Sequence, residues 1–365
     1  MRVANILFNY KKSNNENKIL GVERCFIDYS KHLVAHQNQV VSISKPGMVF
    51  NDEIKKVGSK LVELPAFSNI DLFSIIVLGL VFVSFRVEVA VCHSGRALLF
   101  SRVARIIFYP FLRKLKIVTV NHGIKARKFL KSDYVFNINT YFHRQMINLG
   151  MKEYQSIIFP NMIDIPKDFT KLEKPAFRKP IRLGSLGRIY FEKYFDKVVV
   201  AIALLKQKGI ECEYVIGGVG PKEQEIKELA KQLGVEKNVT ILGWVDNKRE
   251  FFSNIDIFLL PSFGETFGIV LLEAMLYSTP IITSNSWGPE DIISQEVDGI
   301  KVSKDDADEM PKLIAQAIER LNDDQDFAKK LAEKAYEKFN ANYSSDVVGK
   351  RLNDTLFQII NNQIS

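Results

Sequence analysis

The chain has 365 residues, of which 47% are apolar and 25% are charged, so it is longer than a single hydrophobic core usually holds. The composition is that of a globular protein, and no internal repeat or low-complexity tract interrupts it. The three cysteines (Cys25, Cys92, Cys212) are odd in number and widely spaced, which excludes a disulfide framework and a metal-binding cysteine pattern. A reducing cytoplasm is the expected compartment.

Two apolar segments bear on secretion and on membrane insertion. The first nine residues, MRVANILFN, predict a short strand without a cleavage site, so we expect no signal peptide. The longest apolar run, Leu72 to Phe85, has 14 residues, whereas a bilayer-spanning helix needs about 20. We expect this run to form a buried helix, and a helix at a membrane interface is the alternative.

Strand-length apolar runs alternate with helical stretches along the whole chain. In the first half, strands are predicted at 3–9, 40–44, 61–64, 87–92, 116–121, 134–138 and 155–159, with helices beginning near residues 21, 70, 96 and 141. In the second half, strands are predicted at 181–186, 212–217, 239–242, 256–260, 280–283 and 300–302, with helices near 195, 221, 247, 268, 289 and 306. This alternation predicts an α/β fold with two doubly wound parallel sheets, which bind ligands at the carboxyl ends of their strands.

A linker separates the two predicted domains. Residues 164–180 hold three prolines and many charges without apolar periodicity. We therefore expect a first domain of residues 1–165, a linker of residues 166–180 and a second domain of residues 181–344. A final helix from Asp346 to about Asn361 follows a capping context.

The segment PSFGETFGIVLLEAMLYSTP, residues 261–280, places two glutamates eight residues apart around the start of a predicted helix. Glu265 precedes the helix and Glu273 lies within it, with the free N–H groups of Phe267 and Gly268 between them. Such amides bind anions, and carboxylates accept hydrogen bonds from paired hydroxyls. A nucleotide sugar has this layout of sugar, diphosphate and ribose. The alternative is an acidic residue that favours the helix dipole plus one solvated glutamate.

Three other strand ends carry candidate residues. After the strand IRLGSLG, two cations five residues apart, Arg188 and Lys193, can hold a pyrophosphate. The strand CEYVIG runs into glycines that let a backbone approach a ligand closely. The strand VTILG is followed by Trp244, which can form the wall of a base pocket. Solvated charges, turn glycines and a core tryptophan are the individual alternatives, but they do not explain the order of these features along one chain.

These segments resemble glycosyltransferase family 4, the retaining group 1 glycosyltransferases. The resemblance rests on GRIYFEK at 187–193, IGGVGP at 216–221, LGWV at 242–245 and ETFGIVLLE at 265–273, which is followed by AMLYSTPII. Weaker matches are GVER at 21–24, NHG at 121–123 and PNMID at 160–164. The resemblance covers essentially the whole chain and is most specific between residues 181 and 300. Two positions depart from the family pattern, because Leu20 and Tyr194 stand where the family usually has glycine.

The resemblance implies a GT-B fold, in which two Rossmann-like domains face a cleft and the final helix, about residues 345–365, crosses back to the first domain. It implies a nucleotide diphosphate sugar as donor substrate, which we expect to be UDP-linked, and no cofactor. The implied donor-binding residues are Gly21, Gly187, Arg188, Lys193, Gly218, Gly243, Trp244, Glu265, Thr266, Phe267, Gly268 and Glu273. The implied catalytic residues are Glu265, His122, Arg188 and Lys193.

Basic residues are concentrated in the first half of the chain. Residues 1–165 hold 23 Lys and Arg against 11 Asp and Glu, whereas residues 166–365 hold 27 against 31. Between Glu88 and Asp133 there is no acid, and five aromatic residues are interleaved with ten cations: Arg96, Arg102, Arg105, Arg113, Lys114, Lys116, Lys125, Arg127, Lys128 and Lys131. We interpret this basic segment, residues 96–131, as a surface that meets an anionic membrane. A solvated basic face is one alternative, and nucleic-acid binding is another, although no nucleic-acid-binding module accompanies it.

The histidines and acids form no metal-binding pattern, because HxH and DxD arrangements are missing. We therefore predict activity without a bound metal, with Arg188, Lys193 and the helix amides offsetting the charge of the leaving diphosphate. His122 follows the strand KIVTVN, where cleft residues lie, and the resemblance implies contact with the transferred sugar or the acceptor. His93 has a similar position. The other three are expected at the surface of helices: His32, His36 and His143.

Our hypothesis is a retaining glycosyltransferase at the cytoplasmic face of the membrane, with a lipid-linked, lipopolysaccharide or capsule-type glycan as acceptor. An epimerase of the same build, which would convert nucleotide sugars without an acceptor, is the enzyme alternative. A membrane-associated glycan or nucleotide binder whose catalytic half has decayed is the other alternative. The presence of both glutamates and both cations argues against decay, and the basic segment favours a lipid or polymeric acceptor over an epimerase.

Overall fold

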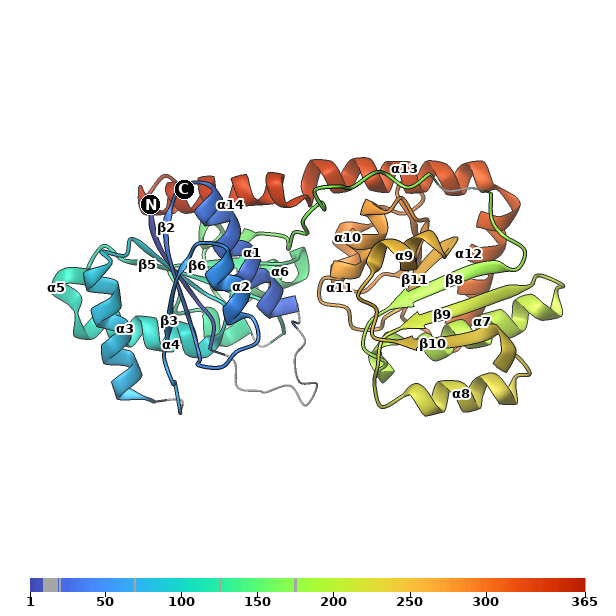
Figure 1. Ribbon diagram of the computed structural model, residues 1–365, viewed down its shortest axis with the longest axis horizontal. Helices are drawn as coiled ribbons and strands as arrows, with labels where there is room; N and C mark the ends of the chain where they lie inside the picture. Colours follow the sequence, from blue (N-terminus) through green and yellow to red (C-terminus); the bar gives the residue numbers. More distant parts are fainter. Residues whose placement is uncertain (9–18, 20, 69, 125, 174–175, 365) are drawn as a thin grey trace. The chain divides into compact units, whose positions relative to one another are not determined.

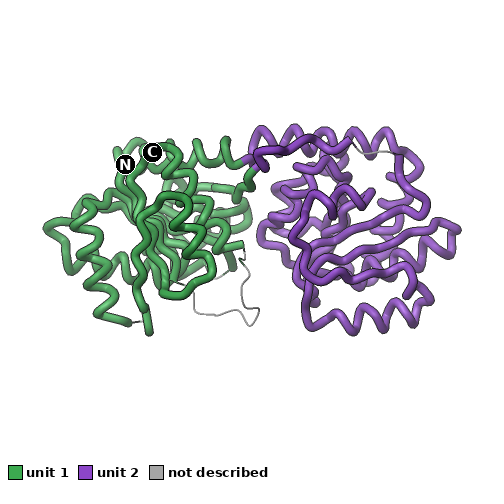
Figure 2. Tube along the Cα trace, in the orientation of Figure 1, with its two compact units in different colours: residues 1–164, 345–365 green, residues 165–344 purple. Residues whose placement is uncertain are grey.

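The computed structural model describes residues 1–8, 19, 21–68, 70–124, 126–173 and 176–364. They form two compact α/β units (Figure 2). Unit 1 consists of Met1–Asp164 and Ser345–Ser365, and unit 2 consists of Ile165–Ser344.

Unit 1 is built on a sheet of seven parallel strands in the order β3-β2-β1-β4-β5-β6-β7 (Figure 1). The strands are β1 Arg2–Ile6, β2 Gln39–Ser44, β3 Lys60–Glu63, β4 Val89–Cys92, β5 Lys116–Asn121, β6 Tyr134–Asn137 and β7 Ser156–Ile158. The helices of the same part of the chain are α1 Gly21–Ala35, α2 Asn51–Lys56, α3 Leu72–Ser84, α4 Gly95–Ile107, α5 Tyr109–Leu112 and α6 Thr140–Asn148. The inner strands are buried on both faces, which explains their continuous apolar runs.

The last helix, α14 Ser345–Ile360, belongs to unit 1 and packs against α1. The Ser345 amide donates to the Ile163 carbonyl at 3.0 Å, and the Arg351 guanidinium donates to the Ile158 carbonyl at 2.8 Å. The end of the chain is therefore part of the first Rossmann-like unit, as the resemblance implied.

Unit 2 has six parallel strands in the order β10-β9-β8-β11-β12-β13. The strands are β8 Ile181–Leu186, β9 Cys212–Gly217, β10 Val239–Gly243, β11 Ile257–Leu260, β12 Ile281–Ser284 and β13 Ile300–Val302. The helices are α7 Phe195–Gln207, α8 Glu223–Gln232, α9 Lys248–Ser253, α10 Ile269–Leu276, α11 Trp287–Ile292, α12 Met310–Asp323 and α13 Gln325–Asn342. Because strand order reverses between β8 and β11, their carboxyl ends border a switch point, where ligands bind in such sheets.

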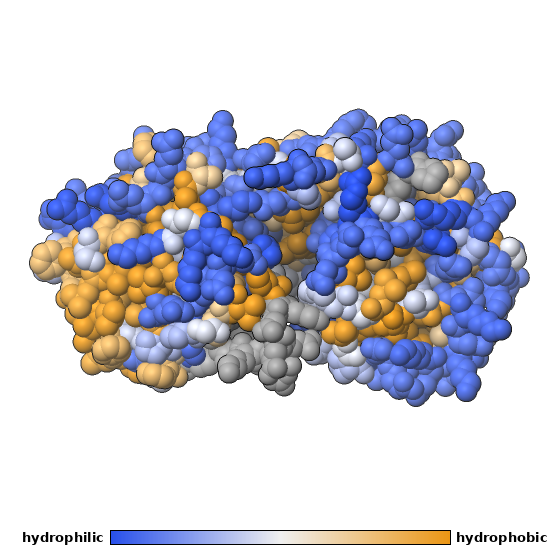
Figure 3. Space-filling view, in the orientation of Figure 1, coloured by the Kyte–Doolittle hydropathy of each residue, from blue (hydrophilic) through white to orange (hydrophobic). Residues whose placement is uncertain are grey.

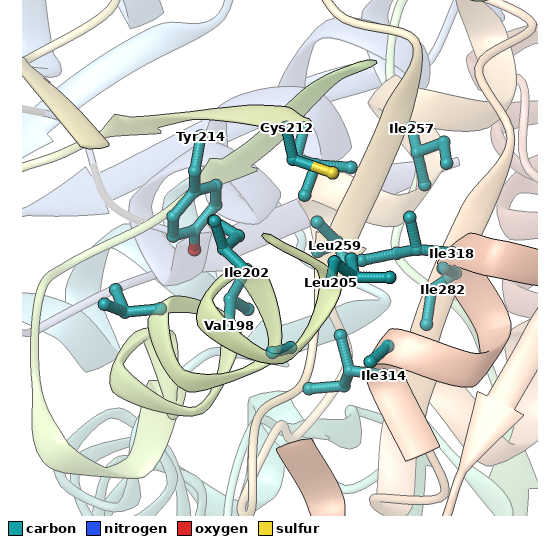
Figure 4. Packing of buried hydrophobic residues seen from close by; sticks show 14 of the residues in the cluster. Val198, Ile202, Leu205, Cys212, Tyr214, Ile257, Leu259, Ile282, Ile314 and Ile318 are labelled. Atoms are coloured by element: carbon teal, nitrogen blue, oxygen red, sulfur yellow. The ribbon is translucent and has the colours of Figure 1, made fainter. Parts of the chain in front are cut away.

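The core of unit 2 lies between one face of its sheet and the helices α7 and α12 (Figure 4). Ile202 of α7 and Ile318 of α12 are buried with Ile257 and Leu259 of β11. Tyr214 brings a hydroxyl into this core, and it donates to the Ser185 hydroxyl at 2.8 Å, which satisfies a buried polar group. This packing holds the strand ends on which the candidate site is built.

The structure corrects three sequence-based expectations in unit 1. Helix α3 is not a buried helix, because it buries one face with Ile75 and Leu78 and leaves the opposite face in solvent. His32 is not a surface group, since its side chain is 8% exposed and bonds the Asp164 carboxylate at 3.2 Å. Arg96 of the basic segment is buried and donates to the Ala66 carbonyl at 2.6 Å.

All the predicted strands are present, with their ends shifted by a few residues, and Asn9 lies outside the described residues. Three helices were not predicted from the sequence. Helices α2 and α5 are only one or two turns long, and α13 follows α12 almost without a break. Within the described residues, no helix combines the length and the apolar character that crossing a membrane would need. The three cysteines are free and buried.

Candidate functional site

The predicted donor-site residues of unit 2 lie at the carboxyl ends of neighbouring parallel strands. Gly187 and Arg188 follow β8, Gly218 follows β9, and Trp244 follows Gly243 at the end of β10. The loop after β11 carries Glu265 to Gly268 and leads into α10. Since all six strands run parallel, these segments meet at one edge of the sheet.

Glycine is required at 218 because the loops after β8, β9 and β10 touch one another. The Gly218 amide donates to the Gly243 carbonyl at 2.6 Å, and a Cβ at Gly218 would lie 1.8 Å from the Gly187 carbonyl oxygen. The same holds at Gly220, where a Cβ would lie 2.2 Å from the Ile189 carbonyl oxygen. Close approach of neighbouring loops is therefore one reason why these positions need glycine.

Lys193 and Glu265 form an ion pair that joins the β8 loop to the β11 loop. The Lys193 ammonium lies 2.5 Å from a Glu265 carboxylate oxygen, and the two side chains are only 17% and 13% exposed. The Phe263 amide also donates to the Glu192 carbonyl at 2.9 Å, which ties the same two loops through the backbone. The pair brings together two residues that are 72 positions apart and that the sequence had singled out separately.

Tyr194 is one of the two positions at which the chain departs from the family pattern. It has φ of +54° and ψ of +33°, the left-handed conformation, and it stands between the short 3-10 turn of Phe191–Lys193 and α7. Glycine adopts this conformation freely, whereas a tyrosine is strained in it. The tyrosine ring packs near the ring of Phe263, with 5.9 Å between the centroids. The other departure, Leu20, lies outside the described residues.

Gly268 is the N-cap of α10, and its φ of +91° turns the chain into the helix. Because glycine has no side chain to cap the helix, the amides of Ile269 and Val270 can bind an anion. The Leu271 amide, in contrast, donates to the Gly268 carbonyl at 2.8 Å. The loop before it is held in place by α11, because the Gly288 amide donates to the Glu265 carbonyl at 3.0 Å. Phe267 is buried and its backbone abuts Gly288, while Thr266 is half-buried.

Glu273 lies in the second turn of α10 and is largely buried. Its side chain is 19% exposed, and its nearest cation is the Lys248 ammonium of α9 at 3.6 Å. The shielded oxygen Oε2 has no hydrogen-bond partner among the described residues. Burial raises the pKa of this carboxyl, and the charge of Lys248 opposes that rise. Sequence reasoning missed Lys248, because nothing in its local sequence relates it to Glu273.

Arg188 and Trp244 stand at the exposed rim of the same edge. The Arg188 guanidinium lies over the Tyr190 ring at 5.1 Å and has no carboxylate within ion-pair distance in the described part of the chain. Trp244 is 42% exposed, so it is not a core residue, and its indole N–H donates to the Asp246 carboxylate at 2.6 Å. An unpaired guanidinium and an exposed indole can contact a phosphate and a base.

In unit 1, His122 lies at the end of β5 and contacts His93 at the end of β4. The His93 Nδ1 and His122 Nε2 atoms are 3.2 Å apart, and His93 Nε2 is 2.8 Å from the Asn5 side-chain oxygen. The Asn5 amide nitrogen donates to the Phe26 carbonyl, so the Asn5 oxygen is the acceptor and His93 carries its proton on Nε2. His93 Nδ1 then accepts from His122 Nε2–H, which leaves His122 Nδ1 as an unprotonated nitrogen.

Burial keeps both histidines neutral. It lowers the pKa of His122 to about 4, aided by the charge of Lys128, and it lowers the pKa of His93 further below its ordinary value. Cys25 is close enough that one donor atom of each of the three residues lies within 4.8 Å of the others. Among the described residues, these three side chains form the group that could hold a metal ion. Two of the histidine nitrogens, His93 Nδ1 and His122 Nε2, are already in contact with each other. Gly21 is exposed at the start of α1.

Part of the chain is similar to a known protein family. Residues 166–338 match the family model described as "Glycosyl transferases group 1". The lipopolysaccharide core biosynthesis glycosyltransferase LpsE of Rhizobium meliloti is 30% identical over 181 residues, which are 50% of this chain and 50% of LpsE. The chain spans about half the length of the first curated relatives that it matches.

Two solved structures share the fold over nearly the whole chain. A glycosyltransferase from Rickettsia africae has a TM-score of 0.79 at 18% identity and covers 98% of both chains. Anabaena HepE in complex with UDP has a TM-score of 0.78 at 17% identity and covers 98% of this chain and 100% of HepE. The two-domain fold predicted from the sequence is confirmed. The motifs at the strand ends and around α10 lie within residues 166–338, so this part of the chain is similar to the group 1 glycosyl transferases.

Proposed function

We propose that this protein is a retaining glycosyltransferase that moves a sugar from a nucleotide diphosphate donor, UDP-linked, to a glycan acceptor. The observation that carries the proposal is the arrangement around α10. An ion-paired carboxylate precedes the uncapped start of the helix, and one turn further on lies a largely buried carboxylate, Glu273, whose oxygen Oε2 has only the Lys248 ammonium at 3.6 Å and no hydrogen bond among the described residues. These are the acceptors and donors that a sugar, a diphosphate and a ribose require.

Each charged group has a defined role in this proposal. The Glu265 carboxylate accepts hydrogen bonds from hydroxyls of the transferred sugar, and the Lys193 ammonium beside it neutralises the diphosphate as it leaves. Arg188, which has a free fork of N–H donors, binds the same diphosphate from the rim. The Glu273 carboxylate accepts from the ribose hydroxyls through Oε2, which has an ion pair with Lys248 but no hydrogen bond among the described residues. Because hydroxyls supply that hydrogen bond, donor binding removes the cost of leaving the oxygen shielded without one.

The remaining donor-site residues contribute backbone and stacking contacts. The amides at the start of α10, beside Phe267 and Gly268, face the negative charge of the diphosphate. Trp244 offers an exposed ring to the base. With two cations and these amides present, leaving-group charge is stabilised without a metal ion. The complex of HepE with UDP supports the choice of UDP by analogy of fold.

His122 of unit 1 acts on the transferred sugar or on the acceptor. Its unprotonated Nδ1 is a hydrogen-bond acceptor at neutral pH, because burial holds the pKa near 4. The contact with His93 keeps the proton on Nε2 and so keeps Nδ1 free. We propose retention of the anomeric configuration because the chain resembles glycosyltransferase family 4.

The proposed acceptor is a lipid-linked, lipopolysaccharide or capsule-type glycan at the inner face of the plasma membrane. The name of LpsE supports this class of acceptor. The basic segment, residues 96–131, would meet anionic headgroups, although its cations do not form one solvated face. Arg96 is buried, Arg105 is paired with Asp133, and Lys125 lies outside the described residues. Nucleic acid is not a proposed partner.

Product analysis with a panel of nucleotide sugars and an extract of lipid-linked acceptors tests the proposal. Mass spectrometry should find one sugar added to the acceptor and free UDP released. Glu265→Ala and Lys193→Ala should each lower this transfer at least tenfold while the protein stays folded. Conversion of the donor without an acceptor would indicate the epimerase alternative, and UDP binding without any product would indicate a decayed enzyme.

A further inference from the structure

One surface of unit 1 exposes an unusual number of large apolar side chains. They belong to residues 67–80, which include most of α3, and to residues 106–111 at the end of α4 and in α5; we name this surface the α3–α5 face. Phe67 is 81% exposed, Phe73 66% and Phe111 72%. Figure 3 shows an apolar area on the left of the view, where Figure 1 places α3 and α5. Exposed apolar patches of this kind mark interaction sites.

The two parts of the face are held together by close packing. The Phe108 ring lies against α3 at Gly79, where a Cβ would come within 2.3 Å of it. The start of α3 is fixed by Asp71, whose carboxylate accepts from the amides of Ser74 and Phe67 at 3.1 and 3.0 Å. The exposed side chains are therefore presented by ordered elements, and their exposure is a property of the fold.

The charges around the face are almost all positive. From residue 67 to residue 132 the only acids are Asp71, whose carboxylate caps α3, and Glu88, which is paired with Arg2 at 3.0 Å. Four cations of the same stretch lie at the surface or half-buried without a carboxylate partner among the described residues: Arg86, Arg102, Arg113 and Lys114. The face thus combines apolar side chains with a rim of unneutralised positive charge.

We propose that the α3–α5 face docks on a membrane by inserting apolar side chains, including Phe73 and Phe111, into a leaflet that carries anionic headgroups. The unpaired cations then lie at headgroup level, where each adds attraction to acidic lipids. A second copy of the chain fits this face less well, because pairing two such faces would bring together two surfaces with the same excess of positive charge. The inference deepens the proposed function, since a membrane-docked enzyme would meet a lipid-linked acceptor.

Membrane binding by inserted apolar side chains depends on salt differently from binding by electrostatic attraction. Salt therefore distinguishes this proposal from membrane binding by the basic segment alone. Salt at about 1 M shortens the Debye length to about 3 Å and weakens attraction between charges at the surface. Apolar insertion does not weaken in the same way. We therefore expect part of the vesicle binding to survive high salt, and that part to depend on Phe73 and Phe111.

Sedimentation with vesicles of phosphatidylcholine and phosphatidylglycerol tests the proposal on the full-length chain. The Phe73→Ser/Phe111→Ser variant should partition at least tenfold more weakly at both low and high salt. The Arg113→Gln/Lys114→Gln variant should be weakened at low salt only. Phe357→Ser is the matched control, because Phe357 is 54% exposed on α14 of the same unit, and it should bind like the unchanged protein.

Three outcomes would overturn the proposal. They are equal binding by the Phe73→Ser/Phe111→Ser variant, no binding of the unchanged protein to these vesicles, and a dimer by light scattering that this variant dissociates. Circular dichroism checks that each variant is folded. The assay requires no sugar transfer, so its failure is distinct from failure of the proposed function, which is measured in detergent solution with an extracted acceptor.

Discussion

The ion pair between Lys193 and Glu265 can be tested by a double-mutant cycle with Lys193→Met and Glu265→Gln. The two charged groups are 2.5 Å apart and their side chains are less than one-fifth exposed. At an effective dielectric constant of about 20, two charges 4 Å apart interact by about 4 kcal/mol, and these are closer. Desolvation consumes much of this energy, but losing one partner leaves the other charge partly buried and alone.

We expect each single substitution to lower the free energy of unfolding of unit 2 by about 2–3 kcal/mol, and the double substitution to cost no more than either single one. The coupling energy is then about 2–3 kcal/mol. Both tryptophans of the chain, Trp244 and Trp287, lie in unit 2, so urea unfolding followed by tryptophan fluorescence reports on this unit. The change in free energy is read from the shift of the midpoint.

The matched control is the pair Lys227 and Glu223 on α8, which are 2.7 Å apart but 55% and 37% exposed. A solvated pair spaced by four residues on a helix contributes about 0.3–0.5 kcal/mol, so its cycle should show almost no coupling. Equal coupling in the two cycles would refute the argument that burial strengthens the Lys193 pair. Sugar transfer should fall at least tenfold in all three site variants, because removing both charges does not restore the groups that bind the donor.

Three further predictions rest on single residues. Gly218→Ala should lower the free energy of unfolding of unit 2, measured by tryptophan fluorescence, by at least about 2 kcal/mol, because the new Cβ would meet the Gly187 carbonyl oxygen. Gly209→Ala is the control: its Cβ would lie in open space, so it should cost about 1 kcal/mol. Equal losses in the two variants would contradict the steric argument. Burial raises the pKa of Asp28 from 3.8 to about 8, so between these values the folded state keeps a proton that the unfolded state releases. The free energy of unfolding should therefore fall by up to about 1.4 kcal/mol for each unit that the pH rises between pH 4 and pH 8. Asp28→Asn should remove this slope from the circular dichroism transition of unit 1, and an unchanged slope would mean that the carboxyl is ionised. Glu273→Gln should weaken UDP binding about tenfold by calorimetry, because a charged acceptor is lost, and unchanged affinity would exclude its contact with the ribose.

The sequence predicted the strands and the helix of the site because each carries a local signal. Apolar runs that end in glycine mark strands whose carboxyl ends meet at one edge, and ETFGIVLLE marks a loop that enters a helix. The same reasoning placed Lys193 and Glu265 in the site separately. It could not predict that they pair, because the contact joins loops 72 residues apart and depends on how the strands β8 and β11 are aligned.

Burial was harder to predict than secondary structure. Helix α3 is apolar on every side, so its sequence has no polar stripe that would show which face meets solvent. His32 was expected at the surface because its partner, Asp164, is 132 residues away in sequence. The sequence also could not show that the glycines at 218 and 220 pack against neighbouring loops, because only the fold brings those loops together.

The central claim is that an activated sugar binds across the start of α10, between Glu265 and Glu273. A crystal structure of the full chain with bound UDP tests this claim most directly. The account predicts the ribose hydroxyls within hydrogen-bond distance of the Glu273 carboxylate and the diphosphate within reach of the Lys193 ammonium and the first amides of α10. A nucleotide bound elsewhere in unit 2, with Glu273 and Lys193 making no contact to it, would contradict the account.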